Sequence, residues 1–193
     1  MRDTDSSAGP ARSSEMRRLV IALVTACSVV LVAAMVLLWG PVRAQSAPFA
    51  PSEADGHITG AASLDDDLPA IAKLDPALVA AMREAAAAAS HDGISFDVTS
   101  GWRSREYQQW LLDDAVASYG SEEVARQFVA TPDASSHVTG NAVDIGPIDA
   151  QSWLIEHGSQ WGICQIYANE RWHFQVATSA GGECPPLRPD AAG

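Results

Sequence analysis

The stretch Ser135-Ser136-His137-Val138-Thr139-Gly140-Asn141-Ala142-Val143-Asp144 places a histidine and an aspartate seven residues apart around a glycine. Its last residues are apolar except for Asp144, which predicts a short buried strand that carries a carboxylate. Such a carboxylate is costly to bury unless a cation accompanies it. Gly140 allows the backbone to turn, so both ends of the stretch can face one point.

A second polar stretch, Glu170-Arg171-Trp172-His173-Phe174, supplies another histidine. Together, His137, Asp144 and His173 offer two imidazoles and one carboxylate. Catalytic zinc commonly takes three protein ligands of this kind and keeps a fourth position for water, whereas a closed structural site usually takes four ligands. We therefore predict one Zn²⁺ ion held by these three residues.

Glu170 precedes His173 by three residues, so on a regular strand the two side chains would point to opposite faces. We therefore expect Glu170 in the turn before the strand, near the metal but not bound to it. Zinc lowers the pKa of a water molecule to about 7, and a neighbouring carboxylate can accept the proton. The pattern predicts Glu170 as a general base.

The surrounding sequence alternates helical and extended patterns. Helices are predicted over residues 76–90, 104–118, a short segment from 121, and 149–158, and strands over 94–99, 143–145, 162–167 and 171–176. Helices come first and mostly antiparallel strands follow. This order favours a small α+β domain with helices packed on one side of an antiparallel sheet.

The flanking segments set the expected domain limits. Residues 40–64 contain several Pro and Gly and little hydrophobic periodicity, which predicts a linker. The folded domain is expected over residues 65–178, followed by an irregular tail over residues 179–193.

An uncharged apolar run fills residues 19–39. As a helix it would span about 31 Å, the thickness of the hydrocarbon layer of a bilayer. The polar residues 1–18 end in Arg17-Arg18, which favours a cytoplasmic N-terminus. We expect a single-pass anchor in the cell membrane, contacting the lipid bilayer, with the catalytic domain extracytoplasmic. The alternative is a cleaved signal peptide, although its apolar part is usually shorter.

Charge and cysteine content agree with that compartment. The chain carries 12 basic and 24 acidic residues, a balance that repels nucleic acid phosphates, so we expect no nucleic acid partner. Outside the apolar run the cysteines are Cys164 and Cys184. An oxidising compartment permits a bridge between them, worth roughly 3 kcal/mol for such a loop. The alternative is two independent thiols.

The motif Ser135-x-His137-x-x-Gly140-x-Ala142-x-Asp144 followed by Glu170-x-Trp172-His173 resembles the zinc D-alanyl-D-alanine carboxypeptidases of the VanY type. These enzymes have a Hedgehog/DD-peptidase-like fold. Ser100-Gly101-Trp102-Arg103-Ser104 resembles the Ser-Gly-Tyr-Arg-Ser motif of the family. The resemblance implies the zinc ligands and the base named above. It also implies that Arg103 binds the substrate carboxylate or the oxyanion, and that Gln108 and Ser135 line the substrate pocket.

The resemblance further implies hydrolysis of the C-terminal residue of peptidoglycan stem peptides. One alternative is an L,D-carboxypeptidase or an endopeptidase acting on the same peptides. A zinc-stabilised module that binds wall peptides without cutting them is another. The presence of both Glu170 and Arg103 argues against such a module, because a binder has no need of the base.

Overall fold

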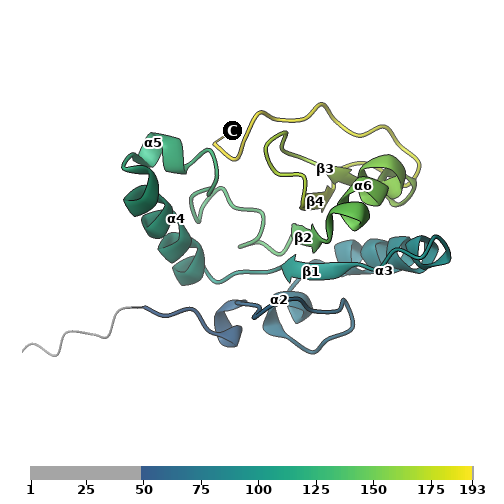
Figure 1. Ribbon diagram of the computed structural model, residues 1–193, viewed down its shortest axis with the longest axis horizontal. Coiled ribbons are helices and arrows are strands. Elements are labelled where there is room, and N and C mark those ends of the chain that lie inside the picture. The colour runs from purple at the N-terminus through teal and green to yellow at the C-terminus, as the bar shows by residue number, and fades with distance from the viewer. Residues whose placement is uncertain (1–48, 193) are drawn as a thin grey trace, which may run out of the picture. The chain divides into compact units, whose positions relative to one another are not determined.

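An antiparallel sheet of four strands forms the centre of the fold in the computed structural model, which describes residues 49–192 (Figure 1). The strands are β1 (Asp97–Ser100), β2 (Val143–Gly146), β3 (Ile163–Gln165) and β4 (His173–Val176), in the order β1-β2-β4-β3. In the central pair, Asp144 lies opposite His173. The register therefore brings the two polar stretches of the sequence side by side.

One face of this sheet packs against α3 (Pro76–His91) and α6 (Ile148–His157). Neighbouring residues of a strand point to opposite faces. Val143, Ile145 and Phe174 are fully buried in the core cluster that also contains residues of α3 and α6. Asp144 and His173 consequently point to the opposite face, so the same strands that build the core also present the candidate site.

The two longest helices begin within one residue of where the sequence predicts. Asp75 caps α3, with its Oδ1 accepting hydrogen bonds from the backbone of Ala77 at 2.8 Å and Leu78 at 3.3 Å. Ser104 caps α4 (Arg105–Tyr119) by accepting from the Tyr107 backbone at 3.0 Å. The short helix α5 (Glu122–Ala125) follows. The remaining helical segments are η1 (Glu53–Asp55), α2 (Pro69–Ala72) and η2 (Gly158–Trp161).

Residues 49–64 differ from the linker that the sequence suggests. Ala62 exchanges backbone hydrogen bonds of 2.8 and 2.9 Å with Val98 on the edge strand β1, and both Ala62 and Leu64 are buried in the core. The edge strand offers free backbone groups that almost any sequence can pair with. The folded domain therefore begins before residue 65. The Pro and Gly content of this segment does not reveal its attachment, because the attachment uses backbone groups.

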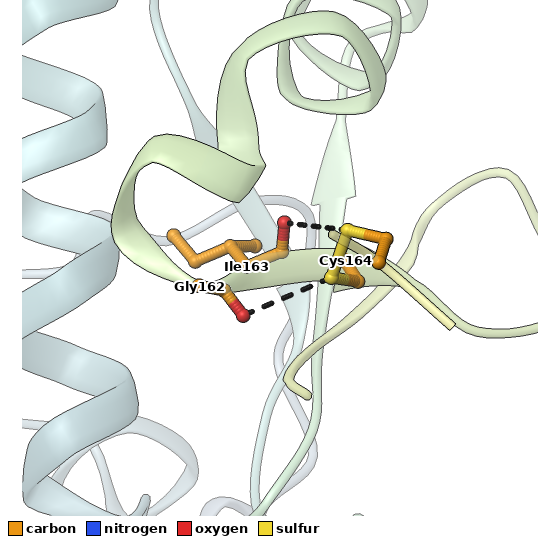
Figure 2. The surroundings of a disulfide bond; sticks show 4 residues. Gly162, Ile163 and Cys164 are labelled. Atoms are coloured by element: carbon orange, nitrogen blue, oxygen red, sulfur yellow. Dashed lines mark hydrogen bonds between the residues drawn. A yellow bond between two sulfur atoms is a disulfide. The ribbon is translucent and has the colours of Figure 1, made fainter. Parts of the chain in front are cut away.

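Residues 179–192 have little regular structure, as expected, yet they are fastened to the domain. They run back across the molecule from the neighbourhood of β3 towards α5 (Figure 1). The disulfide between Cys164 and Cys184 joins the segment to β3, as drawn in Figure 2.

The predicted cytoplasmic tail (residues 1–18), the predicted membrane anchor (residues 19–39) and the first part of the predicted linker lie outside the described residues. Among the helices within residues 49–192, none has the length and hydropathy needed to cross a bilayer.

Candidate metal centre

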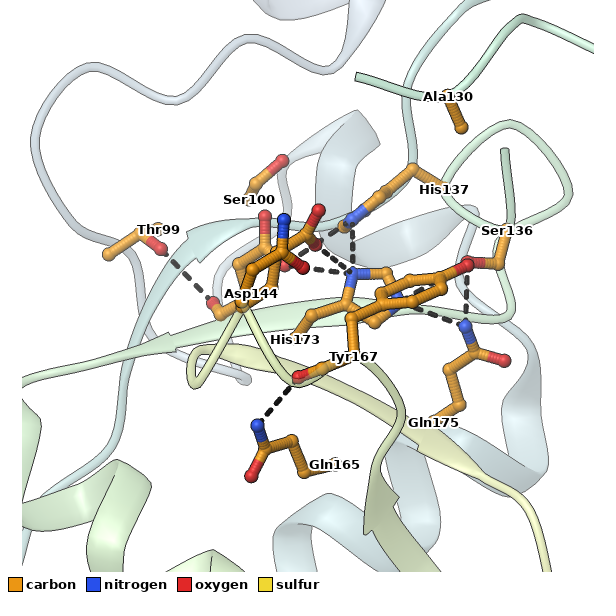
Figure 3. A network of polar contacts seen from close by, with 12 residues as sticks. Thr99, Ser100, Ala130, Ser136, His137, Asp144, Gln165, Tyr167, His173 and Gln175 are labelled. Atoms are coloured by element: carbon orange, nitrogen blue, oxygen red, sulfur yellow. Dashed lines mark hydrogen bonds and ion pairs between the residues drawn. The ribbon is translucent and has the colours of Figure 1, made fainter. Parts of the chain in front are cut away.

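Three potential ligand atoms converge on the open face of the sheet (Figure 3). Nε2 of His137 lies 3.2 Å from Nδ1 of His173, and Oδ1 of Asp144 lies 3.3 Å from each of them. Zinc binds nitrogen and oxygen at about 2.0–2.1 Å in tetrahedral sites, which separates neighbouring ligands by about 3.3 Å. The three atoms therefore already have the spacing that one tetrahedral zinc ion requires.

The hydrogen bonding of Asp144 points to the same conclusion. Its Oδ2 accepts from the Arg103 guanidinium at 3.1 Å, but its Oδ1 is buried without a hydrogen-bond donor. A buried carboxylate oxygen without a partner costs free energy. A cation between the two imidazoles would satisfy this atom, so the donor set fits the predicted metal.

The ring of His137 is oriented by the backbone. Its Nδ1 lies 2.8 Å from the carbonyl oxygen of Gly101, so Nδ1–H donates and Nε2 keeps its lone pair for the centre. Such an outer contact fixes both the tautomer and the direction of a metal-binding histidine. The Ser-Gly-Trp-Arg segment thus contributes a carbonyl group as well as Arg103.

The ring of His173 is oriented by side chains that the sequence analysis did not single out. Its Nε2 lies 2.8 Å from the side-chain amide of Gln175 and 3.3 Å from Oγ of Ser136 (Figure 3). With Nδ1 directed at the centre, Nε2 carries the proton and donates it to the Ser136 hydroxyl, which also accepts a hydrogen bond from the side-chain amide of Gln175 at 2.8 Å. Gln175 follows His173 by two residues and so shares its strand face, a signal that the sequence does contain.

The protonation states suit metal binding. Burial, reinforced by the charge of Arg103, lowers the pKa of His137 to about 4. Burial would raise the pKa of Asp144, but the neighbouring imidazoles and Arg103 hold that pKa well below its usual range. At neutral pH these two side chains are therefore a neutral imidazole and a carboxylate, the forms that bind a metal ion.

Glu170 lies beside the three ligand atoms in the turn before β4. Its side chain is 10% exposed, and its Oε2 is 3.5 Å from Nδ1 of His173. Burial raises the pKa of Glu170 to about 7. An acid with this pKa exchanges protons readily near neutral pH, as a general base must.

Arg103 is held rigidly between the metal centre and helix α4. Its guanidinium donates to Ser100 Oγ at 2.9 Å, to Gln108 Oε1 at 3.1 Å and to Asp144 Oδ2 at 3.1 Å. Gln108, which is 1% exposed, also donates to the carbonyl oxygen of Ala130 at 2.8 Å. Gln108 therefore positions Arg103 as well as lining the pocket.

A cavity of about 70 Å³ opens beside these groups. It is lined by the predicted site residues, Ser135 and Gln108 included, and by a further set that the sequence analysis did not name: Phe128, Val129, Ala130, Ser136, Tyr167, Trp172 and Ala191. A water molecule needs roughly 10–15 Å³ of such volume. The cavity therefore holds a handful of water molecules, which is room for a small amino acid side chain.

This α+β fold directs two imidazoles and a carboxylate at one point, with another acid beside them, which is the ligand set of a catalytic zinc centre. The residues that build this centre all lie within the segment 71–178, which matches the family model of the VanY D-alanyl-D-alanine carboxypeptidases. The chain belongs to this family, as its motifs predict.

Individual relatives support the assignment. A D-alanyl-D-alanine carboxypeptidase of Enterococcus faecalis is 32% identical over 113 residues, which cover 46% of this chain and 42% of the relative. The chain thus spans less than half the length of that curated relative.

Two solved structures are also similar. The first is a vancomycin resistance D,D-pentapeptidase VanY in complex with Zn(II), which is 29% identical with a TM-score of 0.50 over 53% of this chain and 72% of that one. The second is VanYB in complex with D-alanine-D-alanine, which is 28% identical with a TM-score of 0.50 over 53% and 70% of the respective chains.

Proposed function

We propose that this protein is a zinc-dependent D,D-carboxypeptidase that removes the C-terminal D-alanine from peptidoglycan stem peptides. One observation carries the proposal. Three ligand atoms stand 3.2–3.3 Å apart, and the carboxylate of Glu170 lies 3.5 Å from one of them without joining the set. A purely structural metal site has no use for this additional acid.

In the proposed hydrolysis, Glu170, Asp144 and Arg103 have different roles. Held by His137, Asp144 and His173, a zinc ion would supply Lewis acidity toward the scissile carbonyl and would lower the pKa of a water molecule. Glu170 accepts the proton of the attacking water and returns it to the leaving amine, a transfer that suits its pKa of about 7. Asp144 and Arg103 form an ion pair of 3.1 Å, which holds the guanidinium at the rim of the cavity.

Arg103 keeps donor capacity for the substrate. A guanidinium has five N–H groups, and three protein acceptors are bound here, one for each of its nitrogen atoms. Because Arg103 also lines the cavity, its remaining N–H groups suit either the terminal carboxylate of the peptide or the oxyanion formed during hydrolysis.

The cavity favours removal of a terminal residue. A pocket of about 70 Å³ admits one small residue, whereas an endopeptidase has to pass a continuing chain beyond the scissile bond. D-alanine fits this size. Cleavage after an L residue uses the same chemistry, so mass spectrometry of the products from D,D- and L,D-terminated stem peptides distinguishes the two carboxypeptidase activities.

The test uses the full-length chain, purified in detergent, loaded with zinc and given a stem pentapeptide that ends in D-Ala-D-Ala. We expect release of D-alanine from the wild type and a loss of about 10²–10⁴-fold in Glu170→Gln, with zinc retained. Glu156→Gln is the matched control, because Glu156 is 77% exposed on α6. Undiminished release by Glu170→Gln would refute the assigned base. Peptide binding with zinc but without turnover would favour the binding module.

We also propose that residues 19–39 anchor the protein in the cell membrane with the catalytic domain outside the cytoplasm. The apolar run after Arg17-Arg18 supports this orientation, and the Cys164–Cys184 disulfide suits an oxidising compartment. Protease added to intact cells should digest the domain, and alkaline carbonate should leave it in the membrane fraction. A protein released into the medium would instead favour a cleaved signal peptide.

A further inference from the structure

The C-terminal strap, residues 184–192, lies outside the segment that matches the family model and beside the candidate site. It starts at the disulfide with Cys164 on β3, where Cys184 Sγ also lies 3.8 Å from the Ile163 carbonyl oxygen (Figure 2). From there it passes back towards α5 (Figure 1). The strap therefore connects strand β3 with the region of helix α5.

The strap is fastened at points on both sides of the cavity. Arg188 donates to the Ile166 carbonyl at 2.9 Å and accepts from the Ala168 backbone at 2.8 Å. Further on, the Ala191 backbone donates to the Gln127 carbonyl at 3.3 Å. These contacts join the turn that carries Glu170 to the loop that follows α5.

The Gln127 carbonyl receives a second donor from the turn itself. The Asn169 side chain donates to the same oxygen at 2.9 Å, so two independent bonds hold the opposite walls of the cavity together. Ala191 also packs against the buried group of Cys164, Ile166 and Tyr167. The strap is thus built into the domain by a covalent bond, backbone hydrogen bonds and apolar packing.

Ala191 brings this segment to the cavity wall. Ala191 lines the cavity together with Tyr167, Phe128, Val129 and Ala130. The cavity measures about 70 Å³, and Ala191 contributes one of the smallest side chains that could stand there. The small side chain of Ala191 and the fixed position of the strap together limit the size of the group that fits into the cavity.

We propose that the C-terminal strap is the size filter of the specificity pocket: it closes the cavity so that only a small C-terminal residue of the peptide enters. This inference rests on the proposed carboxypeptidase function and adds a determinant of its substrate range. A fitted hydrophobic pocket discriminates by about 10–200-fold between substrates that differ by a methylene group. Removal of the strap should therefore lower the preference for a small over a large C-terminal residue by a measurable factor.

The experiment compares kcat/KM for stem peptides that end in D-Ala-D-Ala, D-Ala-D-Leu and D-Ala-D-Phe. A shortened chain that ends at Leu187 keeps the disulfide but loses the contacts of Arg188 and Ala191. Ala191→Phe fills the cavity without shortening the strap. Leu187→Phe is the control, because Leu187 is 49% exposed and does not line the cavity. Zinc content and circular dichroism report whether each variant is folded.

The wild type should prefer D-Ala over D-Phe by at least about tenfold, and the shortened chain should lose at least about tenfold of that preference. Ala191→Phe should raise KM and lower kcat/KM for D-Ala by a similar factor, while Leu187→Phe matches the wild type. An unchanged preference in the shortened chain, or an unaffected KM in a folded Ala191→Phe protein, overturns the proposal.

Failure of the catalytic proposal remains distinguishable from failure of the size filter. If no peptide is hydrolysed by the wild type, the catalytic proposal fails. The filter is then measured by calorimetric binding of the same peptides to zinc-loaded Glu170→Gln chains, with and without the strap. Equal affinity of the full-length chain for D-Ala and D-Phe peptides would refute the filter in that assay.

Discussion

Replacing Glu170 by glutamine should stabilise the metal-free protein at neutral pH, although it removes the proposed base. Burial raises the pKa of Glu170 from 4.5 to about 7, and its side chain is 10% exposed. One pKa unit corresponds to about 1.4 kcal/mol, so ionised Glu170 should lower the free energy of unfolding by about 3 kcal/mol.

The sign follows from the direction of the shift. The folded state binds this proton more tightly than the unfolded state, so the stabilising effect of the protonated form is complete below pH 4.5. It is lost as the pH rises to about 7. Glutamine cannot ionise. The difference in unfolding free energy between Glu170→Gln and wild type should therefore widen by about 3 kcal/mol from pH 4.5 to pH 7.5.

The assay is urea unfolding in excess chelator at several pH values across this range, with the disulfide intact. Other titrating groups are common to both proteins and cancel in the difference. Glu156→Gln controls for the loss of an acidic side chain at the surface, because Glu156 is 77% exposed. A difference that stays constant, or that narrows as the pH rises, would refute the account of Glu170 as a buried acid.

Two further predictions concern the surroundings of the centre and the strap. Gln175→Ala removes a contact of 2.8 Å to Nε2 of His173, so zinc affinity measured by chelator competition should fall by about 10–100-fold; unchanged affinity would show that the ring needs no such support. Replacing both Cys164 and Cys184 by serine opens a link across a sequence separation of 20, and thermal unfolding should show a loss of about 3 kcal/mol; equal stability would mean that the strap is held without the bond.

The metal centre was largely predictable because its residue types and spacing are unusual. His137 and Asp144 lie on either side of Gly140, and His173 follows in a stretch that alternates like a strand. The register that sets Asp144 opposite His173 needed the structure. The presence of a cation between these side chains could nevertheless be predicted, because a buried carboxylate such as that of Asp144 needs one.

The outer contacts were harder to predict. The carbonyl of Gly101 that orients His137 is a backbone group, and every residue in the chain carries one. Gln175 and Ser136 are ordinary polar residues whose role depends on which way two side chains turn. The spacing of Gln175 places it on the strand face of His173, but that spacing alone does not show that its amide reaches the ring.

The segments on either side of the expected domain were the least predictable. Residues 49–64 attach through a backbone bridge at Ala62, and the C-terminal strap attaches largely through the backbone of Arg188 and Ala191. Backbone pairing leaves little trace in side-chain periodicity. Cys184 alone indicated that the strap returns to the domain.

The disulfide at the base of the strap makes completion of the fold depend on an oxidising compartment. None of the three predicted metal ligands is a thiol, so a nascent chain held in a reducing compartment can still assemble the centre. Its strap, however, would be tethered by non-covalent contacts alone. On the role proposed for the strap, full substrate selectivity would then be acquired only once oxidation has closed the Cys164–Cys184 bond.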